Sequence, residues 1–417
     1  MRKLGIALSI LIGLPIVLVP QAAVASTPPF AQQTLPSNDG WAASGTGTTG
    51  GSGGTVTTVR TRDELAAAVA GTAPKIVLVD GDIAGPDCAG LADPEYTLEA
   101  YLAAYDPAVW GRATDPSGPL EAARVRSVAK QRALTEIKVG ANTTIFGLRG
   151  SSMKKLTLMI DTAPNVIVRN MTFIDAADCF PRWRPTDGAE GNWNSEYDLV
   201  SVRRSTNVWI DHNTFTDGDN PDSVQPVYFG RPWQVHDGAL DVTHTSSLVT
   251  VSWNVFTNHD KTLLIGSSDT VGPDVGRLAV TLHHNVFDGV GQRAPRVRFG
   301  QVDLYNNYFK VYGSLYDYSV GIGIQSAVYM ENNYFRVDET IPLDQILKDW
   351  KGTVVTEIGS RVNGEQVSLL DTYNAKFDPD FGPDAGWTPA LRHHAPLPTA
   401  VVPLLTTFLA GAGRLPA

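Results

Sequence analysis

An Asn-x-Phe tripeptide recurs along the middle of the chain, and this repeat constrains the possible folds more than any other feature of the sequence. A looser copy, Asn170-Met171-Thr172-Phe173, precedes five regular copies. Neighbouring Phe residues of the series are separated by 22 to 42 positions. Most copies follow a short run with the composition of a β-strand, such as Val249-Thr250-Val251. The regular copies begin at Asn213, Asn254, Asn285, Asn307 and Asn333.

This repeat predicts a solenoid. One short strand per unit cannot bury its own apolar side, so the units must stack on one another to form a continuous core. The shortest spacing, 22 residues, fits one coil of a parallel β-helix, and the longer spacings fit coils that carry inserted loops. We therefore predict an all-β parallel β-helix, in which each Asn hydrogen-bonds to the Asn of the next coil and each Phe stacks inside. A β-sandwich with coincidental Asn-x-Phe turns is the alternative.

The sequences that flank the repeats differ from it. The capping-box pattern at residues 61–64, Thr-Arg-Asp-Glu, predicts a short N-terminal helix over residues 65–70 that covers the open end of the solenoid. Residues 93–136 are predicted to be mostly helical and to lie on the surface. For residues 385–417, which are rich in Pro, Leu and Ala, we predict an irregular arm along the outside.

Residues 1–25 have the layout of a secretory signal peptide, with two basic residues, an apolar run over 4–20 and Ala-Val-Ala at 23–25. A membrane anchor is the alternative, but a spanning helix needs ~20 apolar residues, and Pro15 interrupts this shorter run. We therefore expect cleavage after residue 25, a secreted extracellular protein, and a single β-helix catalytic domain over residues 26–417.

The charge of the chain limits its partners. The formal net charge of −10 argues against nucleic acid, because phosphate binding needs a positive surface. An acidic protein can still bind a polyanionic sugar if a bound cation bridges the carboxylates of protein and sugar. We expect no nucleic-acid or membrane partner, and we expect a monomer.

The chain has two cysteines, Cys88 and Cys179. In an exported protein they can form a disulfide, or they can be two small buried apolar residues. The sequence leaves both possibilities open.

Four aspartates form an acidic candidate site. Asp237 and Asp241 would lie ~13 Å apart in an unbroken strand, too far to share one ion, but Gly238 permits a bend. With Asp198 from the preceding coil they supply three carboxylates, which are hard oxygen ligands suited to Ca²⁺. Asp187 is a possible fourth contributor. A plain surface turn is the alternative for each Asp-Gly pair.

Basic residues form a second candidate site. Arg296 and Arg298 would share one strand face, whereas Arg293 lies beyond the break at Pro295. Lys261 comes from an earlier coil. A solvated charged edge is the alternative, but an acidic and a basic cluster on successive coils favour a groove that binds a polyanion.

Other chemistries have weaker support in the sequence. No GxSxG, HExxH or P-loop motif is present. We interpret His212, His283 and His284 as structural, hydrogen-bonding residues. Paired carboxylates that hydrolyse a glycosidic bond remain possible, because the chain has many aspartates.

Several motifs resemble those of polysaccharide lyase family 1, and of the secreted bacterial pectate lyases in particular. The resemblance covers roughly residues 38–340, and it implies a right-handed parallel β-helix whose long loops form a groove. The motifs are Asn207-Val208-Trp209-Ile210-Asp211-His212, Asp237-Gly238-Ala239-Leu240-Asp241, Ser252-Trp253-Asn254, Asp260-Lys261, Gly266-Ser267-Ser268-Asp269, Arg293-Ala294-Pro295-Arg296-Val297-Arg298-Phe299-Gly300, and Gly191-Asn192-Trp193-Asn194-Ser195 with Tyr197-Asp198.

The resemblance also implies roles for the acidic residues. Asp198, Asp237 and Asp241 match the calcium ligands of the family. Asp187 matches a carboxylate that can hold a further calcium ion when substrate is bound. Pectin lyases of the same superfamily lack the calcium carboxylates, so this set favours polygalacturonate over methyl-esterified pectin.

The basic residues receive roles in the same way. Lys261 and Arg298 match residues that bind uronate carboxylates, Arg296 joins them as a substrate-binding candidate, and Arg293 matches the proposed general base. The expected reaction is an endo-acting β-elimination that leaves 4,5-unsaturated oligogalacturonides. Arginine is normally protonated, so a base role for Arg293 needs an unusual environment or alkaline conditions. The alternative is that Arg293 only orients or stabilises the substrate.

Two further functions compete with the lyase. One is a polygalacturonase-like hydrolase on a similar solenoid, and the other is a β-helix that binds uronans without catalysis. The intact set of lysine and arginine residues argues against the second, because binding alone does not need Arg293.

Overall fold

A computed structural model describes residues 27–416 of the chain. The predicted signal peptide, residues 1–25, lies outside the described residues, so secretion stays a prediction. Within residues 27–416, every helix is too short or too polar to cross a lipid bilayer.

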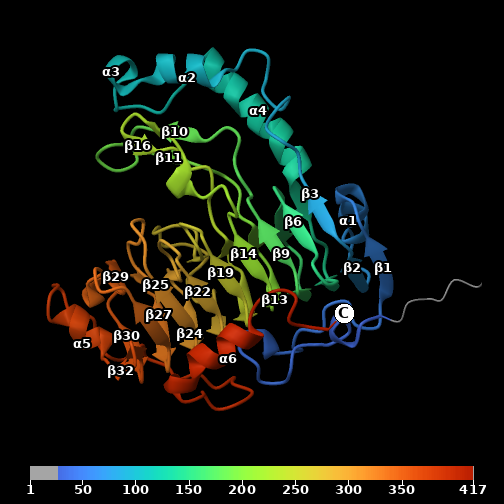
Figure 1. Cartoon of the computed structure of the whole chain (residues 1–417), viewed down its shortest axis with the longest axis vertical. Helices are drawn as coiled ribbons and strands as arrows, with labels where there is room; N and C mark the ends of the chain where they lie inside the picture. Colours follow the sequence, from blue (N-terminus) through green and yellow to red (C-terminus); the bar gives the residue numbers. More distant parts are fainter. Residues whose placement is uncertain (1–26, 417) are drawn as a thin grey trace, which may run out of the picture.

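The described chain winds into a parallel β-helix, with β1 and α1 near one end and β30, β32 and α5 near the other (Figure 1). Each complete coil contributes one strand to each of three sheets, here named A, B and C, whereas the first turns at the N-terminal end lack the strand of sheet C. In one coil, β12 (Val200–Arg203) belongs to sheet C, β13 (Thr206–Asp211) to sheet A and β14 (Thr214–Thr216) to sheet B. The predicted right-handed parallel β-helix is thereby confirmed.

The strands of the three sheets pair in parallel, except for β32 at the end of sheet B. Sheet A has ten strands: β1 (Thr55–Val59), β2 (Lys75–Val79), β5 (Thr143–Gly147), β8 (Val166–Arg169), β13, β18 (Ser247–Ser252), β21 (Val280–His283), β24 (Gln301–Tyr305), β27 (Ala327–Glu331) and β30 (Val355–Ile358). Sheet B has ten: β3 (Asp82–Ala84), β6 (Ser152–Lys154), β9 (Thr172–Ile174), β14, β19 (Val255–Thr257), β22 (Val286–Asp288), β25 (Tyr308–Val311), β28 (Tyr334–Val337), β31 (Arg361–Val362) and β32 (Glu365–Gln366). Sheet C has eight: β4 (Glu136–Lys138), β7 (Thr157–Asp161), β12, β17 (Leu240–Thr243), β20 (Leu264–Ile265), β23 (Arg296–Val297), β26 (Val320–Gly323) and β29 (Leu347–Trp350).

Helices and two hairpins surround these sheets. The hairpins pair β10 (Arg182–Arg184) with β11 (Asn192–Asn194), and β15 (Val227–Tyr228) with β16 (Arg231–Pro232). The α-helices are α1 (Arg62–Ala68), α2 (Leu98–Tyr105), α3 (Pro107–Trp110), α4 (Pro119–Thr135), α5 (Leu369–Asn374) and α6 (Val402–Leu409). The 3-10 helices are η1 (Pro29–Ala31), η2 (Trp41–Ala43), η3 (Asp222–Val224), η4 (Leu343–Gln345) and η5 (Thr399–Val401).

The repeated asparagines form a ladder in the turn between sheets A and B, where they are fully buried. The backbone N–H of Asn213 donates to Asn254 Oδ1 over 2.9 Å, and Asn254 Nδ2 donates to the carbonyl of Ile210 over 2.9 Å. This pattern satisfies backbone groups that the turn removes from water. The same backbone-to-side-chain bond continues from Asn254 to Asn285, Asn285 to Asn307 and Asn307 to Asn333.

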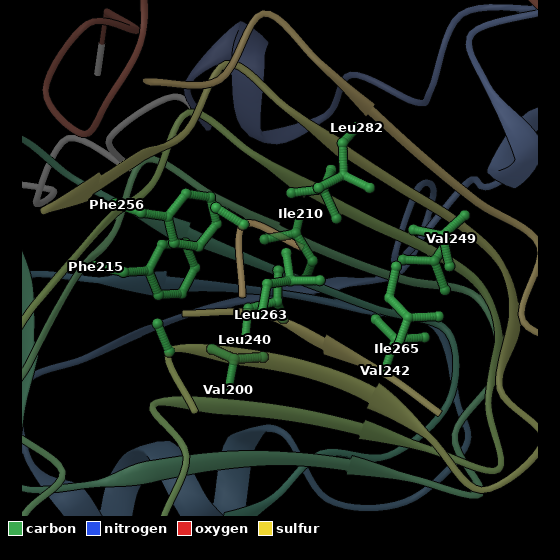
Figure 2. Packing of buried hydrophobic residues seen from close by; sticks show 14 of the residues in the cluster. Val200, Ile210, Phe215, Leu240, Val242, Val249, Phe256, Leu263, Ile265 and Leu282 are labelled. Carbon is green, nitrogen blue, oxygen red and sulfur yellow. The ribbon is translucent and has the colours of Figure 1, made fainter. Parts of the chain in front are cut away.

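The repeated phenylalanines stack inside sheet B. Successive ring centroids from Phe173 to Phe335 are 4.4 to 5.1 Å apart, with interplanar angles of 8 to 15°. Figure 2 shows the rings of Phe215 and Phe256, from sheet B, side by side and next to inward-facing aliphatic residues of sheets A and C. The core is therefore one column of identical layers, as the repeat predicts.

The N-terminal cap and the outer helices are of the kind that the sequence predicted. Thr61 and Glu64 form the predicted capping box at the start of α1, and Leu65 is buried against the first coil. The region predicted to be helical, residues 93–136, contains α2, α3 and α4, which lie along the outside of the solenoid (Figure 1).

The C-terminal arm differs from the prediction in one respect. Residues 402–409, expected to be irregular, form α6, because Val402 buries its side chain with Val286 and Tyr308 against the solenoid. The rest of the arm is largely irregular and is tied to sheet A by Trp387, whose Nε1 donates to the carbonyl of Ala327 over 3.0 Å.

The two cysteines form a disulfide, Cys88–Cys179, which resolves the alternative that the sequence left open. The bond joins the segment after β3 to the segment between β9 and β10. It thereby attaches the helical segment to the coil that carries the β10–β11 hairpin.

A buried ionic cluster lies on the outer side of sheet A. Arg169 and Asp211 form a salt bridge of 2.7 Å, with side chains only 3% and 1% exposed. His212 Nδ1 lies 2.7 Å from the same carboxylate, and its ring stacks on Trp253. The structural role predicted for His212 agrees with these contacts.

The asparagine ladder can be tested at its middle. We expect Asn254→Ala to lower the free energy of unfolding by about 3 kcal/mol, because it leaves the Ile210 carbonyl and the Asn213 N–H buried without partners. Denaturant titration measures this loss. Asn258→Gly, which removes one bond from an exposed side chain of the same coil and suits its left-handed backbone (φ 52°), is the control and should cost about 1 kcal/mol or less. Equal losses in the two variants would contradict the ladder.

The Arg169–Asp211 cluster should make stability depend on acid. Burial alone would raise the pKa of Asp211, but the charges of His212 and Arg169 outweigh it and hold that pKa below its ordinary value. The ionised carboxylate therefore stabilises the protein above its unfolded pKa of about 4, and this contribution disappears as the pH falls. At pH 7 we expect Asp211→Asn to be about 3 kcal/mol less stable than wild type, and we expect the difference to shrink below pH 4. A difference that stays constant down to pH 3 would show that Asp211 has no such role.

Candidate active site

The candidate residues gather on the outer face of sheet C. Parallel pairing aligns Ser201 with Asp241, Val242 with Ile265, and Leu264 with Arg296. Strand side chains alternate between two faces, so Val242 and Ile265 point into the core while their neighbours point outward. Figure 2 shows Leu240, Val242 and Ile265 on the inner side.

Two of the predicted acidic residues converge on Gly238. Its backbone N–H donates to Asp198 Oδ1 over 2.9 Å. A Cβ placed on Gly238 would lie 2.3 Å from Asp241 Oδ1 and 2.9 Å from Asp198 Oδ1. Asp237 precedes β17 in an irregular segment, so the unbroken strand that would separate the carboxylates does not form. Gly238 contributes through its missing side chain, which leaves room for both carboxylates.

The electrostatics of this cluster favour a bound cation. Burial, followed by the charge of Asp237, raises the pKa of Asp198 to about 7. Burial and the charges of Asp198 and Asp237 raise the pKa of Asp241 well above its ordinary value. Like charges in low dielectric oppose ionisation, and a divalent cation would relieve that repulsion. Carboxylate oxygens are the donor type that Ca²⁺ prefers, so the residues present fit this ion.

The cluster is not a complete set of metal ligands in this arrangement. Within residues 27–416, no three or more His, Cys, Asp or Glu side chains are placed to hold a metal together. Asp237 instead lies 3.9 Å from Lys261 Nζ, measured to its Oδ1. Calcium binding by Asp198, Asp237 and Asp241 therefore stays a prediction.

The fourth predicted acidic residue, Asp187, has surroundings of its own. It sits in the β10–β11 hairpin with an exposed side chain, and it accepts a hydrogen bond of 3.2 Å from Asn194 Nδ2. Among the residues described, no hydrogen bond or salt bridge links it to Asp198, Asp237 or Asp241.

Lys261 and Arg293 lie on successive coils beside the acidic cluster. A parallel bridge aligns Lys261 with Gln292, next to Arg293. Lys261 is 8% exposed in its side chain, and its Nζ donates to the carbonyl of His236 over 3.5 Å. Arg293 has a left-handed backbone, with φ of 59°, and forms no salt bridge within the part of the chain described. Its Nε is buried without a hydrogen-bond partner among those residues.

Arg296 and Arg298 follow on β23 and just after it, and their surroundings were not predicted. Arg298 Nε lies 2.6 Å from Asp269 Oδ1, and Arg298 Nη1 donates to the carbonyl of Gly266 over 2.9 Å. The guanidinium of Arg296 lies 3.8 Å above the ring centre of Trp350. Burial, and then the charge of Arg298, lowers the pKa of Arg296 to about 10. Asp269 and Trp350 thus hold two of the predicted substrate-binding residues.

A buried group of histidines and aspartates beneath Asp237 and Lys261 was missed. Burial would lower the pKa of His236, but hydrogen bonds to Asp175 and Asp222 outweigh it and raise that pKa to about 10. The pKa of His259 is also raised, chiefly because Asp217 outweighs the effect of burial. These residues come from three coils and lie in no motif with fixed spacing, so the sequence carried no signal for their contact.

Comparison with known proteins places the chain in a family. The family model described as pectate lyase matches residues 113–380. A pectate lyase of Bacillus subtilis (strain 168) is 41% identical, over all of this chain and all of that protein.

Solved structures give the same result. A pectate lyase bound to a hexasaccharide has a TM-score of 0.88 and 40% identity, over 93% of this chain and 100% of that one. A second, from work on the substrate specificity and anti β-elimination mechanism of pectate lyase, has the same TM-score and identity over 92% and 99%. With its parallel β-helix and its matched motifs, the chain belongs to the pectate lyase family.

Proposed function

We propose that this enzyme is a calcium-dependent lyase that cleaves α-1,4-linked polygalacturonate by β-elimination to 4,5-unsaturated oligogalacturonides. One observation carries the proposal: carboxylates and cationic side chains occupy adjoining coils on the outer face of sheet C. Such a surface suits an anionic sugar chain whose carboxylates are partly neutralised by a bridging cation. The hexasaccharide held by a structural relative supports a carbohydrate chain as the ligand.

Asp198, Asp237 and Asp241 would hold the calcium ion, with Asp198 and Asp241 already facing each other across Gly238. Calcium supplies positive charge that neutralises a uronate carboxylate and stabilises the charge that develops beside it. Asp187 would contribute to a further ion when substrate is bound.

The cationic residues would bind and orient the substrate. Lys261 and Arg298 would each bind a uronate carboxylate, and Arg296 would extend the cationic surface along β23. Arg298 shares its charge with Asp269 at 2.6 Å, so a substrate carboxylate would share or displace that partner. The C5 proton of galacturonate becomes more acidic when the adjacent carboxylate is neutralised in this way.

Arg293 is the candidate base. Within the described residues no carboxylate pairs with it, so its guanidinium is available to the substrate. In its neutral form, Arg293 would take the C5 proton, and the C5–H electron pair would be delocalised into the adjacent carboxylate. That pair would form the C4–C5 double bond as the C4–O bond breaks, and the departing oxygen would take a proton from water. The hydroxide left behind would remove the proton from Arg293 and restore its neutral form. The protonated form could only orient substrate, so we expect activity to favour alkaline pH.

The position of the site within sheet C supports endo cleavage. Strands β4 and β7 continue the sheet on one side, and β26 and β29 continue it on the other. A polymer that follows the solenoid axis can therefore extend past the reacting bond in both directions. A rapid fall in the viscosity of the polymer, ahead of product release, would be the expected sign.

The reaction type and the cation can be tested together. During incubation with polygalacturonate at alkaline pH and with Ca²⁺, we expect absorbance in the unsaturated-uronate band to rise, because elimination creates a conjugated double bond. Excess chelator should abolish the rise, and added Ca²⁺ should restore it. New reducing ends without this absorbance would indicate a hydrolase. Binding without either product would indicate a uronan-binding β-helix, and a rise that ignores chelator would exclude calcium dependence.

The roles proposed for Lys261 and Arg293 can be tested by substitution. We expect Lys261→Ala and Arg293→Ala to lower kcat/KM by at least ~10²-fold, because each removes a group that acts in the transition state. The melting temperature checks that each variant is folded. Arg336→Ala, which removes an exposed arginine from sheet B, is the matched control and should leave kcat/KM unchanged. A fully active Arg293→Ala enzyme would overturn the assignment of the base.

A further inference from the structure

Five ionisable side chains meet in the interior directly beneath the candidate active site. Such groups are rarely buried without a role, because removing charge from water is costly unless every charge is paired. The mechanism proposed above uses none of them. Their side chains are His236, 2% exposed; His259, 1%; Asp175, 6%; Asp217, 0%; and Asp222, 4%.

These side chains form one connected network. His236 Nε2 lies 3.1 Å from Asp175 Oδ1, and His236 Nδ1 lies 3.2 Å from Asp222 Oδ1. His259 Nδ1 lies 2.6 Å from Asp217 Oδ1, and the second oxygen of Asp217 lies 3.5 Å from His236 Nδ1. Asp217 therefore joins the two histidines, which come from different coils.

The network ends at two residues of the active site. His259 Nε2 donates to the backbone carbonyl of Asp237 over 3.0 Å. The carbonyl of His236, one residue earlier, accepts from Lys261 Nζ over 3.5 Å. Asp222 also binds this segment, because its Oδ1 accepts from the backbone N–H of Val235 over 2.9 Å. The irregular stretch before β17 is thus held from below at three consecutive residues.

We propose that His259 is a positioning residue that fixes the backbone of Asp237, and hence its carboxylate, for calcium binding. This inference rests on the function proposed above. Asp237 lies outside the assigned strands. Its N–H donates to the carbonyl of Tyr197 over 3.3 Å, and its own carbonyl is held by His259, so the histidine fixes the side of the peptide that leads to Gly238. Groups that orient a metal ligand from behind affect metal affinity although they never touch the ion.

Burial by itself does not explain the contact with the active site. The Arg169–Asp211 pair is also buried, with side chains 3% and 1% exposed, and it binds no residue of the candidate site within the described chain. That pair therefore provides a matched control. A change there tests the effect of losing a buried ion pair without disturbing Asp237.

The two ring nitrogens of His259 allow a decisive pair of variants. His259→Gln places its amide where Nε2 lies, so it can keep the bond to the Asp237 carbonyl and lose the bond to Asp217. His259→Asn places its amide where Nδ1 lies, so it can keep the bond to Asp217 and lose the bond to Asp237. Calorimetric titration of each full-length protein with Ca²⁺, without substrate, gives the dissociation constant. Thermal unfolding of the same samples gives the loss of stability.

We expect His259→Asn to weaken calcium binding by about 10-fold or more. His259→Gln, which keeps the bond to the Asp237 carbonyl and loses only the orienting bond to Asp217, should weaken it by about 3-fold. The control Asp211→Asn should lose stability and keep its calcium affinity. Equal affinities in the Asn and Gln variants would overturn the inference while leaving the proposed function intact. A wild-type protein that does not bind Ca²⁺ would overturn the proposed function, and this inference with it.

A second variant protects the test against misfolding. If His259→Asn does not fold, Asp217→Asn keeps the size of the side chain and weakens the charge-assisted bond that orients the His259 ring. Its calcium affinity should fall by about 3-fold or more, and an unchanged affinity would equally overturn the inference.

Discussion

The stacking of one coil directly on the next is the constraint on which the rest of the molecule depends. A single coil buries little, but parallel pairing places Phe on Phe and Asn on Asn at every step. The stacked rings fill the interior, and the asparagine amides satisfy the backbone groups that each turn removes from solvent. Because every layer repeats the same contacts, a loop of any length can be inserted between strands without disturbing the core.

The placement of the candidate active site follows from this same register. When the inner positions of sheet C are fixed by the core, the outer positions on successive coils must lie next to one another. Asp241 therefore lies beside Ser201, and Arg296 lies beside Leu264, although these residues are far apart in the sequence. Residues that the solenoid holds rigidly are suited to chemistry that depends on charge placement, because little reorganisation is needed when the substrate binds.

Charge is arranged in two layers around this surface. The outer layer presents carboxylates and cations to the substrate, and the inner layer pairs histidines with aspartates under the segment that carries Asp237. Asp269 belongs to the outer layer, where it keeps Arg298 and Lys351 paired and thereby limits the free positive charge. An acidic protein can still bind an anionic substrate at such a surface, because lysine and arginine side chains lie beside the carboxylates there.

The sequence by itself determined the solenoid and its N-terminal cap, because repeats and capping patterns can be recognised within short stretches of sequence; the residues that it proposed for the site stay predictions. It could not determine which side chains from separate coils meet, since the inserted loops differ in length and no spacing links His236 to Asp175 or Arg296 to Trp350. It also could not decide the Cys88–Cys179 bond or the helix at Val402–Leu409, which depend on the surface that each segment meets. Only the tertiary structure decided these contacts, because burial and charge pairing depend on residues that are distant in the sequence and close in the fold. The repeat, in contrast, can be recognised in the sequence alone.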